Sequence, residues 1–560
     1  MDFKTQLAKS IATDGLPFEE VLPLVKKSDG VNGDFALPCF KFAKTLKTSP
    51  VLLAQKLAEQ LKAKRAVKDA VAVNGYLNMF VDRAAASKKI AEEVLNKDSL
   101  ADATKGAGKT VCIDYSSINI AKPFHIGHLG TTAIGSALYK VYKAQGYHVV
   151  GINHLGDWGT QFGKLIVAYR KWGDKEAIDK GGVRALQDIY VKFHREAETD
   201  PSLDDEARRW FAKIEQGDEY ALGLFDYFKE ITLKDVKKVY ERLNVNFDSW
   251  NGESFYNDKM QPVIDALKQK GLAVVSDGAL IVDLEKYGMP PCLLVKADGA
   301  TLYATRDLAA AVYRHDVYDF DKCLYVVAYQ QNLHFKQFFK VLELMGYDWA
   351  SKMEHVAYGM VSLAEGSMST RKGNAVWLSD VLDKAVEKSL DVIKTKSPDL
   401  ANKEEIAEQV GVGAVVFSAL ANSRIKDIVF DYDRVLNFDG ETAPYLQYAH
   451  ARCCSILAKT EAPDLAKAIW TDIDNDESWQ VLSKINEFDD VLTQVTDKNE
   501  PSLLSNYLID LAQLYNKFYL ANRVIDNGVP SHARLLLTDA TRKALRQGLN
   551  LLGIAAPQKM

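Results

Sequence analysis

The 560-residue sequence has no CxxC pair, no long apolar run and no excess of positive charge. Its six cysteines are scattered, so we expect neither a protein-bound zinc nor a disulfide framework, but reduced core thiols in a cytoplasmic protein. Without a long apolar run, neither a membrane span nor secretion is expected. The net charge of −5 gives no general attraction to nucleic acid, so a polyanion would need a local basic face.

The composition is that of a folded protein with several domains. Hydrophobic residues make up 47% and charged residues 26%, which are globular averages, so bulk disorder is excluded. At about 150 residues per domain, the length predicts three or four domains.

The first hundred residues have the pattern of a small α/β domain. Ser49 and Pro50 are typical of the start of a helix, with serine as N-cap and proline in the first helical position. Apolar residues then alternate between positions 71 and 81 around Asn74-Gly75, which predicts strands joined by a turn. The polar, glycine-containing stretch 97–110 is a plausible linker.

A βαβ unit follows this linker. Residues 111–115 are a short apolar run, a helical pattern then stops at Gly146, and residues 147–152 are again strand-like. This order opens a doubly wound sheet, in which ligands bind at the carboxyl ends of the strands.

A charged, helix-patterned stretch at about 175–250 interrupts the α/β pattern as an insertion would. Strand-like patterns resume at 279–284 and 323–328, and from about residue 405 the periodicity is almost only helical. The sequence therefore predicts an α/β and all-α multidomain protein with a doubly wound, Rossmann-like central domain. The expected domains are 1–105 (α/β), 106–405 (doubly wound, with the helical insertion) and 406–560 (an α-helical bundle).

The loop after the first strand of the βαβ unit contains His125-Ile126-Gly127-His128 and leads into a helix. A helix N-terminus offers unpaired N–H groups and partial positive charge to phosphates, and Gly127 allows close approach of the backbone. Taken alone, the string is more often a turn with two surface histidines, and a zinc site is less supported because no third ligand is spaced nearby.

A second polar loop, GSMSTRKGN at 366–374, carries the adjacent cations Arg371 and Lys372. Such a loop suits the charge that spreads over a transferring phosphoryl group, although for this string in isolation a plain exposed polar loop is favoured.

The two loops together, in this order around a doubly wound sheet, resemble the signature motifs of class I aminoacyl-tRNA synthetases. The similarity is closer to arginyl-tRNA synthetases and runs nearly end to end. It is carried by YSSINIAKPFHIGHL, NHLGDWGTQFGKL, TRDLAAA, QQNLH, MSTRKG and NFDGETAPYLQYAHAR. The chain departs from the pattern at three positions: Ser367, where many class I enzymes have lysine, Gly130, where arginine is frequent, and Ile118, where proline is usual.

The resemblance implies activation of L-arginine by ATP with Mg²⁺, followed by transfer to the 3′-terminal ribose of tRNA(Arg), with activation requiring bound tRNA. His125 and His128 would contact the ATP phosphates, and Arg371 with Lys372 the departing pyrophosphate. The implied ATP-binding set is completed by Lys122, Gly127, Met368 and Ser369.

Arginine recognition is implied at a second group of residues. A planar guanidinium requires carboxylates that accept in pairs, and the resemblance points to Glu253 and Asp307, with Tyr303 one helical turn before Asp307. The α-amino and carboxylate end of the substrate would be held at matching family positions. These are Asp114, Asn119, Gln331 and His125.

The helical last third resembles an anticodon-binding domain, in which Tyr445 and Tyr448 could stack on bases or simply pack in the core. The N-terminal domain would contact the tRNA elbow, and a monomer is the family habit. Two alternatives remain: another adenylylating ligase on the same fold, and an inactive paralogue that only binds tRNA.

Overall fold

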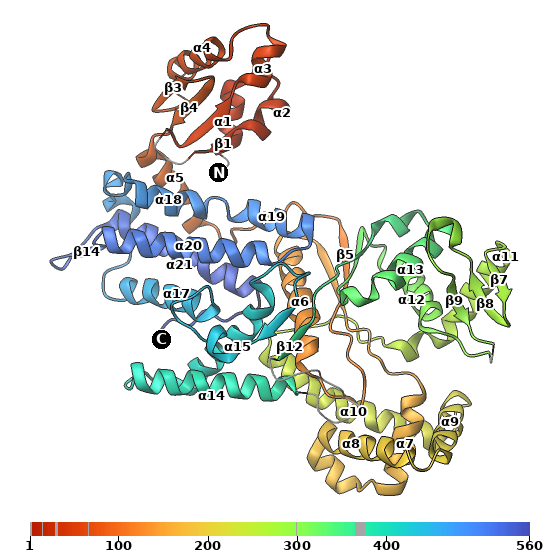
Figure 1. Cartoon of the computed structure of the whole chain (residues 1–560). Helices are drawn as coiled ribbons and strands as arrows, with labels where there is room; N and C mark the ends of the chain where they lie inside the picture. The colour runs from red at the N-terminus through yellow and green to blue at the C-terminus, as the bar shows by residue number, and fades with distance from the viewer. Residues whose placement is uncertain (1–2, 14, 29–31, 65, 298, 364–375) are drawn as a thin grey trace. The chain divides into compact units, whose positions relative to one another are not determined.

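The computed structural model describes residues 3–13, 15–28, 32–64, 66–297, 299–363 and 376–560. The chain forms two compact units (Figure 1). The first unit consists of residues 1–100, 449–489 and 510–545, and the second of residues 101–448, 490–509 and 546–560.

The N-terminal part of the first unit is a four-stranded antiparallel sheet in the order β1-β2-β4-β3, with helices packed on it. Ser49 caps α4 by accepting from the Leu52 N–H, and β3 and β4 form a hairpin across Asn74-Gly75, so both local predictions are confirmed. The elements are α1 Phe3–Ile11, α2 Phe18–Val21, β1 Lys26–Lys27, β2 Phe35–Pro38, α3 Phe40–Thr45, α4 Pro50–Ala63, β3 Asp69–Val73, β4 Tyr76–Phe80 and α5 Arg83–Asn96.

The core of the second unit is a parallel sheet in the order β11-β10-β5-β6. Because β6 lies on one side of β5 and β10 on the other, the connections leave β5 in opposite directions, and the carboxyl ends of β5 and β10 form a switch point where ligands bind. The doubly wound prediction is confirmed. The elements are β5 Thr110–Asp114, α6 Leu129–Ala144, β6 His148–Ile152, β10 Lys322–Tyr325, α13 Asn332–Leu344 and β11 Met353–His355.

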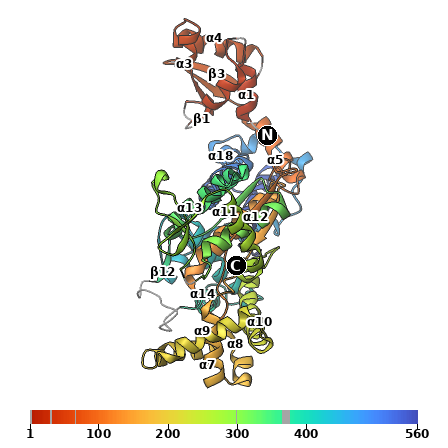
Figure 2. The same cartoon turned by 90° about the vertical axis from the view of Figure 1, so that its right-hand side faces the viewer.

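Between β6 and β10 the chain leaves the sheet twice. The first excursion is a group of helices that pack on one another and stay together in both views (Figures 1 and 2). It comprises α7 Thr160–Trp172, α8 Lys175–Ala197, α9 Ser202–Glu215 and α10 Glu219–Arg242, and so contains the predicted helical stretch.

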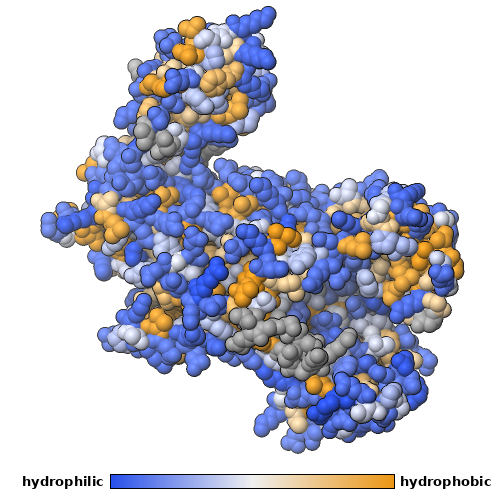
Figure 3. All heavy atoms as spheres, viewed as in Figure 1, coloured by the Kyte–Doolittle hydropathy of each residue, from blue (hydrophilic) through white to orange (hydrophobic). Residues whose placement is uncertain are grey.

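The second excursion is a three-stranded antiparallel sheet flanked by α11 Met260–Gln269 and α12 Tyr303–Tyr318. Its strands are β7 Ala273–Ser276, β8 Ala279–Val282 and β9 Cys292–Val295. The pattern at 279–284 is therefore a strand, but it does not extend the parallel sheet. Part of this sheet is apolar at the surface, with Val275 75% exposed, and Figure 3 shows hydrophobic side chains over it.

The last third of the chain is mainly helical, as predicted, but it also contains short strands. Strand β13 Ile428–Phe430 pairs with β12 Val361–Leu363, and β14 Ile525–Asp526 pairs with β15 Val529–Pro530. Among the described helices, none is both long and apolar enough to cross a bilayer. The helices are α14 Leu378–Lys396, α15 Lys403–Leu420, α16 Tyr432–Val435, α17 Ala443–Leu457, α18 Asp476–Ile485, α19 Phe488–Lys498, α20 Ser502–Ala521 and α21 His532–Leu551.

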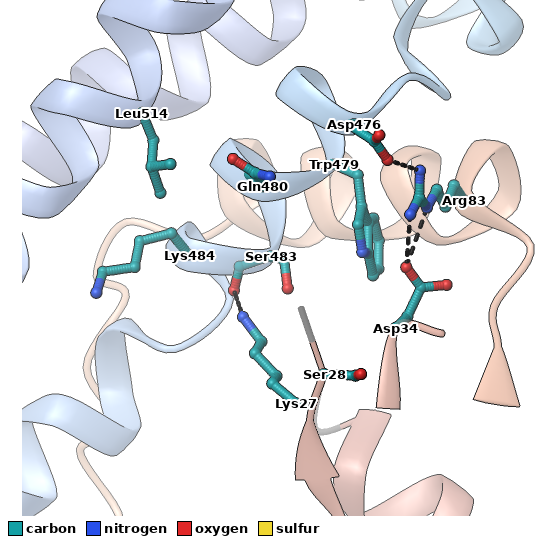
Figure 4. A pocket seen from close by; sticks show the side chains of 10 residues that line it. All are labelled: Lys27, Ser28, Asp34, Arg83, Asp476, Trp479, Gln480, Ser483, Lys484 and Leu514. Atoms are coloured by element: carbon teal, nitrogen blue, oxygen red, sulfur yellow. Dashed lines mark hydrogen bonds and ion pairs between the residues drawn. The ribbon is translucent and has the colours of Figure 1, made fainter. Parts of the chain in front are cut away.

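Within the first unit, an arginine at the start of α5 joins the N-terminal sheet to α18 (Figure 4). Arg83 donates to Asp34 from Nη2 at 2.9 Å and to Asp476 from Nη1 at 2.6 Å. Beside this bridge is a cavity of about 360 Å³, whose wall includes Lys27 and Trp479.

Gly146 follows α6 at a position where both the backbone conformation and the available space favour glycine. Its φ is +84°, and a Cβ would lie 1.8 Å from the Ala103 carbonyl oxygen. We predict that Gly146→Ala lowers the free energy of unfolding by about 2–4 kcal/mol, from positive φ and overpacking together. Gly108→Ala is the control, because Gly108 has φ +75° but no atom near the new Cβ, and should cost only about 1 kcal/mol. Equal losses in urea denaturation would contradict the steric explanation.

Candidate active site

The His125–His128 loop lies at the switch point and leads through a 3-10 turn, Ile126–His128, into α6. His125 Nδ1 accepts a hydrogen bond from the Gly127 N–H at 3.1 Å, and His128 Nδ1 accepts from the His125 N–H at 3.2 Å. A neutral imidazole has one donor and one acceptor nitrogen. Both protons are therefore on Nε2, and each ring can donate a hydrogen bond from that atom.

Burial keeps these two rings uncharged. It lowers the pKa of His125 to about 4 and that of His128 to about 3, and the charges of His125 and Lys122 lower the pKa of His128 further. At neutral pH the loop therefore offers uncharged donors at a helix N-terminus, and any positive charge for phosphates must come from elsewhere, including Lys122.

The residues that follow the second signature loop pair directly with the first. The Ile126 N–H donates to the Val376 carbonyl at 3.1 Å, and the Leu378 N–H donates to the Phe124 carbonyl at 2.9 Å. Residues 376–378, which follow this loop in the sequence, therefore run alongside His125, which bridges to Trp377. The site residues predicted within that loop lie outside the described residues: Ser367, Met368, Ser369, Arg371 and Lys372.

The segment between β5 and His125 is strained. Ser116, Ser117 and Ala121 have φ of 69°, 45° and 57°, although none of them is glycine. Non-glycine residues in this region cost of order 1 kcal/mol each, and such strain gathers at functional sites. The strain therefore indicates that the backbone conformation of this segment is important for the site.

Hydroxyl groups from two helices hold this strained segment. The Ser116 N–H donates to Thr131 Oγ1 of α6 at 2.9 Å, and its Oγ contacts the Tyr240 hydroxyl of α10 at 2.7 Å. The Ala121 N–H donates to Thr232 Oγ1, also of α10, at 3.0 Å. Thr232 and Tyr240, which lie on a buried face of the predicted insertion, were not identified from the sequence. Helix α10 therefore stabilises the site in addition to connecting the elements on either side of it.

Glu253 enters the site from the turn after α10. Its N–H donates to the Leu155 carbonyl at 2.9 Å, and the next residue, Ser254, donates from N–H and Oγ to Asp157, both at 2.8 Å. Asp157 is fully buried and pairs with Lys229 at 2.6 Å. The sequence did not identify Asp157 or Lys229, which anchor the turn that carries Glu253.

Asp307 and Tyr303 lie in the first two turns of α12, so the predicted helix is confirmed there. Asp307 Oδ2 is 2.7 Å from His334 Nε2, and the Tyr303 ring packs on the ring of His334, with centroids 4.7 Å apart. Burial and the charges of Asp307 and Asp157 raise the pKa of Glu253 to about 7, whereas Arg306 lowers it. The two predicted carboxylates therefore share one electrostatic environment.

The residues predicted to hold the other end of the substrate are dispersed around the switch point. Asp114 ends β5, but its carboxylate is 5% exposed and already engaged by Arg314 at 2.7 Å and by the Ser117 hydroxyl at 2.7 Å. Asn119 is exposed and bridges to Gly156, and Gln331 is exposed in the turn after β10. Asp114 thus lies beneath the site, paired with a buried arginine that sequence reasoning missed.

One of the departures from the family pattern, Gly130, can be placed in the fold. A Cβ on Gly130 would lie 2.8 Å from the Tyr358 ring, so that ring occupies the space of the larger residue that the family often has. Across the described part of the chain, no three His, Cys, Asp or Glu side chains are grouped so as to hold a metal ion. Tyr445 and Tyr448 lie on α17, where Tyr445 is half-buried and Tyr448 is 44% exposed.

A parallel sheet with this switch point and a histidine loop at a helix N-terminus define the chain as a class I aminoacyl-tRNA synthetase. The family model "tRNA synthetases class I (R), catalytic domain" matches residues 90–432. Models of the DALR anticodon binding domain and of the arginyl tRNA synthetase N-terminal domain match residues 446–560 and 1–81.

Full-length relatives identify the particular family. The arginine–tRNA ligase of Clostridioides difficile is 48% identical to this chain, with 100% of both chains covered. The arginyl-tRNA synthetase of Thermus thermophilus superposes with a TM-score of 0.80 at 26% identity, covering 100% of this chain and 99% of the other. That of Plasmodium falciparum shares the fold, with a TM-score of 0.77 at 23% identity, covering 100% and 98%. The chain belongs to the arginyl-tRNA synthetase family.

The hydrogen bonds and lowered pKa values predict a specific protonation state for the histidine loop. Nitrogen spectra of ¹⁵N-histidine-labelled protein should show His125 and His128 as neutral Nε2–H tautomers from pH 5.5 to 8, assigned by the single variants His125→Asn and His128→Asn. Since both pKa values are depressed, the stability these rings contribute is present above about pH 6.5 and is lost as the pH falls toward 4. Protonation of either ring near pH 6.5 would contradict this picture.

Proposed function

We propose that this arginine–tRNA ligase binds its amino acid between Glu253 and Asp307, beside the His125–His128 loop. The observation that carries the proposal is that Glu253, in the turn after α10, lies 3.8 Å from Arg306 of α12, the residue next to Asp307, and the charge of Asp307 helps to raise the pKa of Glu253. Two like charges gathered in a partly buried site attract a cation. A guanidinium can donate to both carboxylates through its planar fork, which the ammonium of lysine cannot match.

The first step is the activation of arginine by ATP. A carboxylate oxygen of arginine attacks the α-phosphorus, the bond to the bridging oxygen of pyrophosphate breaks, and arginyl-adenylate and pyrophosphate result. We propose that His125 and His128 donate from Nε2 to phosphate oxygens, assisted by Lys122, by the backbone at Gly127, and by the positive end of α6. Arg371, Lys372, Met368 and Ser369 are proposed partners of ATP and the leaving pyrophosphate from residues outside the described part.

We propose that Mg²⁺ arrives with the ATP phosphates. The described side chains offer no cluster of three metal-ligating groups, and Mg²⁺ is commonly held by substrate phosphates with few protein ligands. When present, it would neutralise phosphate charge that the uncharged histidines cannot.

The second step transfers arginine to tRNA. A hydroxyl of the 3′-terminal ribose attacks the carbonyl carbon of arginyl-adenylate, AMP leaves, and the hydroxyl proton is released. Asn119 and Gln331 are proposed to hold the α-amino and carboxylate end of the substrate at the switch point. The role of Asp114 is proposed to be indirect, because its carboxylate is engaged by Arg314 and Ser117.

Contacts with the rest of the tRNA are proposed for the flanking regions. Residues 1–105 would contact the elbow, residues 106–405 would form the catalytic domain, and residues 406–560 would bind the anticodon, with Tyr445 and Tyr448 stacking on bases. A cytoplasmic monomer is proposed as well; the free thiols of all six cysteines support a reducing compartment.

ATP–pyrophosphate exchange tests the ligase activity. Exchange should depend on arginine and on tRNA(Arg), and lysine should not replace arginine. Absence of exchange under every condition would favour the inactive paralogue, which no similarity found here supports.

The same assay tests the arginine pocket through Glu253→Gln and Asp307→Asn. Each variant removes one charged acceptor of the guanidinium, which should cost about 3 kcal/mol and raise the arginine KM about 100-fold. The ATP KM should stay within about twofold. Asp258→Asn is the matched control, since this carboxylate lies in the same turn as Glu253 but is 79% exposed and pairs with Lys259. An unchanged arginine KM in both pocket variants would refute the assignment.

Stacking by the exposed ring of α17 is tested with Tyr448→Ala. Loss of one stacked base should cost about 1–3 kcal/mol, seen as a rise of roughly 5- to 150-fold in the tRNA KM during aminoacylation. Tyr448→Phe keeps the ring and should behave like the native chain. If alanine leaves the tRNA KM unchanged, the ring does not stack on tRNA.

A further inference from the structure

Arg306 is a buried cation next to the arginine pocket, and its hydrogen-bonding capacity is largely unused. It is 8% exposed, and Nη1 is 3.8 Å from Glu253 Oε2, too far for a hydrogen bond. Nη2 donates to Asn257 Oδ1 only at 3.5 Å, and Nε is buried without a hydrogen bond to any described residue. A guanidinium has five N–H donors, so most of its desolvation cost is uncompensated.

The position of Arg306 in its helix adds to this cost. It is the fourth residue of α12, within the first turn, where the helix macrodipole places partial positive charge. A positive side chain near this end of the helix is unfavourable, whereas the negative charge of the next residue, Asp307, is favourable. The stability of the helix therefore does not account for an arginine here.

The surrounding charges suggest what Arg306 does. Four charged groups act on Glu253: Arg306 and Asp307, which belong to α12, Asp157, which belongs to the loop after β6, and Lys122, which belongs to the loop after β5. The charge of Asp157 is largely offset, because Lys229 lies 2.6 Å from it. Arg306 also faces Glu215 of α9. Of the cations around Glu253, Arg306 contributes the larger effect in keeping it ionised.

We propose that Arg306 is a positioning residue that acts as the resident counter-ion of Glu253 and favours its carboxylate form until the substrate guanidinium arrives. The inference rests on the proposed assignment of Glu253 to the arginine pocket. At 3.8 Å Arg306 acts through its charge without a direct hydrogen bond, so the oxygens of Glu253 can still accept from the substrate. A protonated Glu253 would itself donate from one oxygen and could not receive the guanidinium fork.

The pH dependence follows from this arrangement. With the pKa of Glu253 raised to about 7, arginine binds most tightly above that pH, and its affinity falls as Glu253 becomes protonated below it. Removing the positive charge of Arg306 raises the pKa of Glu253 further, so the loss of affinity begins at higher pH. A role of Arg306 in packing alone would weaken binding equally at every pH.

The test is the arginine dissociation constant of the full chain, measured calorimetrically from pH 6 to pH 8, below the range where the substrate amine titrates. In Arg306→Gln the inflection should move up by about one pH unit, toward the upper end of the measured range, so that binding on the acid side becomes about tenfold weaker than in the native chain. Arg306→Lys keeps the charge and should restore the native profile, while ATP affinity should not change in either variant.

A second variant keeps Arg306 in place. Asn257→Asp places a carboxylate beside the Arg306 guanidinium, which offsets the positive charge that acts on Glu253. The inflection in arginine affinity should therefore again move to higher pH. Native-like profiles in both Arg306→Gln and Asn257→Asp would overturn the proposal.

Glu253→Gln separates this inference from the pocket assignment. If Glu253 binds arginine, this variant should bind weakly and lose the pH dependence around 7. If it binds arginine normally, the assignment of Glu253 is wrong, and the inference about Arg306 fails with it. If it binds weakly while the Arg306→Gln profile is unmoved, only the inference about Arg306 fails.

Discussion

The site depends on one constraint, the strained course of the chain from Ser116 to Ala121. Three non-glycine residues at positive φ do not persist unless their surroundings hold them there. The holding groups are hydroxyls: Thr131 on α6, and Thr232 and Tyr240 on α10. The strained segment then delivers His125 and His128 to the N-terminus of α6, at the carboxyl end of β5. Helix α10 thereby helps to hold the segment that leads to His125 and His128.

Buried charge in the second unit is compensated to different degrees. Asp157 pairs with Lys229 at 2.6 Å and also accepts two hydrogen bonds from Ser254, so it is well satisfied and anchors a turn. Asp114 and Arg314 pair at 2.7 Å beneath the switch point. Glu253 and Arg306 stay 3.8 Å apart, and Arg306 Nε has no described partner. Asp157 and Asp114 are thus in direct contact with their cations, whereas Glu253, the residue proposed to bind arginine, has no direct hydrogen bond to Arg306.

Local features were predictable from the sequence because their causes are local. Ser49 and Pro50 set the start of α4, alternation around Asn74-Gly75 produced the β3–β4 hairpin, and the apolar run at 111–115 became β5. Partners distant in the sequence were not predictable from periodicity. Asp114 pairs with Arg314, two hundred positions away. The strand at 279–282 pairs in a separate antiparallel sheet, and its periodicity alone could not predict its partner strand. The proposed roles of Glu253 and Asp307 came from family resemblance, and the structure adds the effect of Asp307 on the pKa of Glu253 and the neighbouring cation, Arg306.

In the proposed function, the two signature loops would divide the contacts with ATP between uncharged hydrogen-bond donors and positive charge. His125 and His128 are uncharged at neutral pH and have their Nδ1 atoms engaged by the backbone, so each offers one directed N–H. An uncharged donor tolerates burial beside α6, where an imidazolium would face both desolvation and the positive end of the helix. Full positive charge is better supplied from a separate segment, and the chain next to His125 is the continuation of the loop that carries Arg371 and Lys372. If ATP is bound as proposed, supplying hydrogen-bond donors and full charges from different segments would avoid burying several like charges in one place.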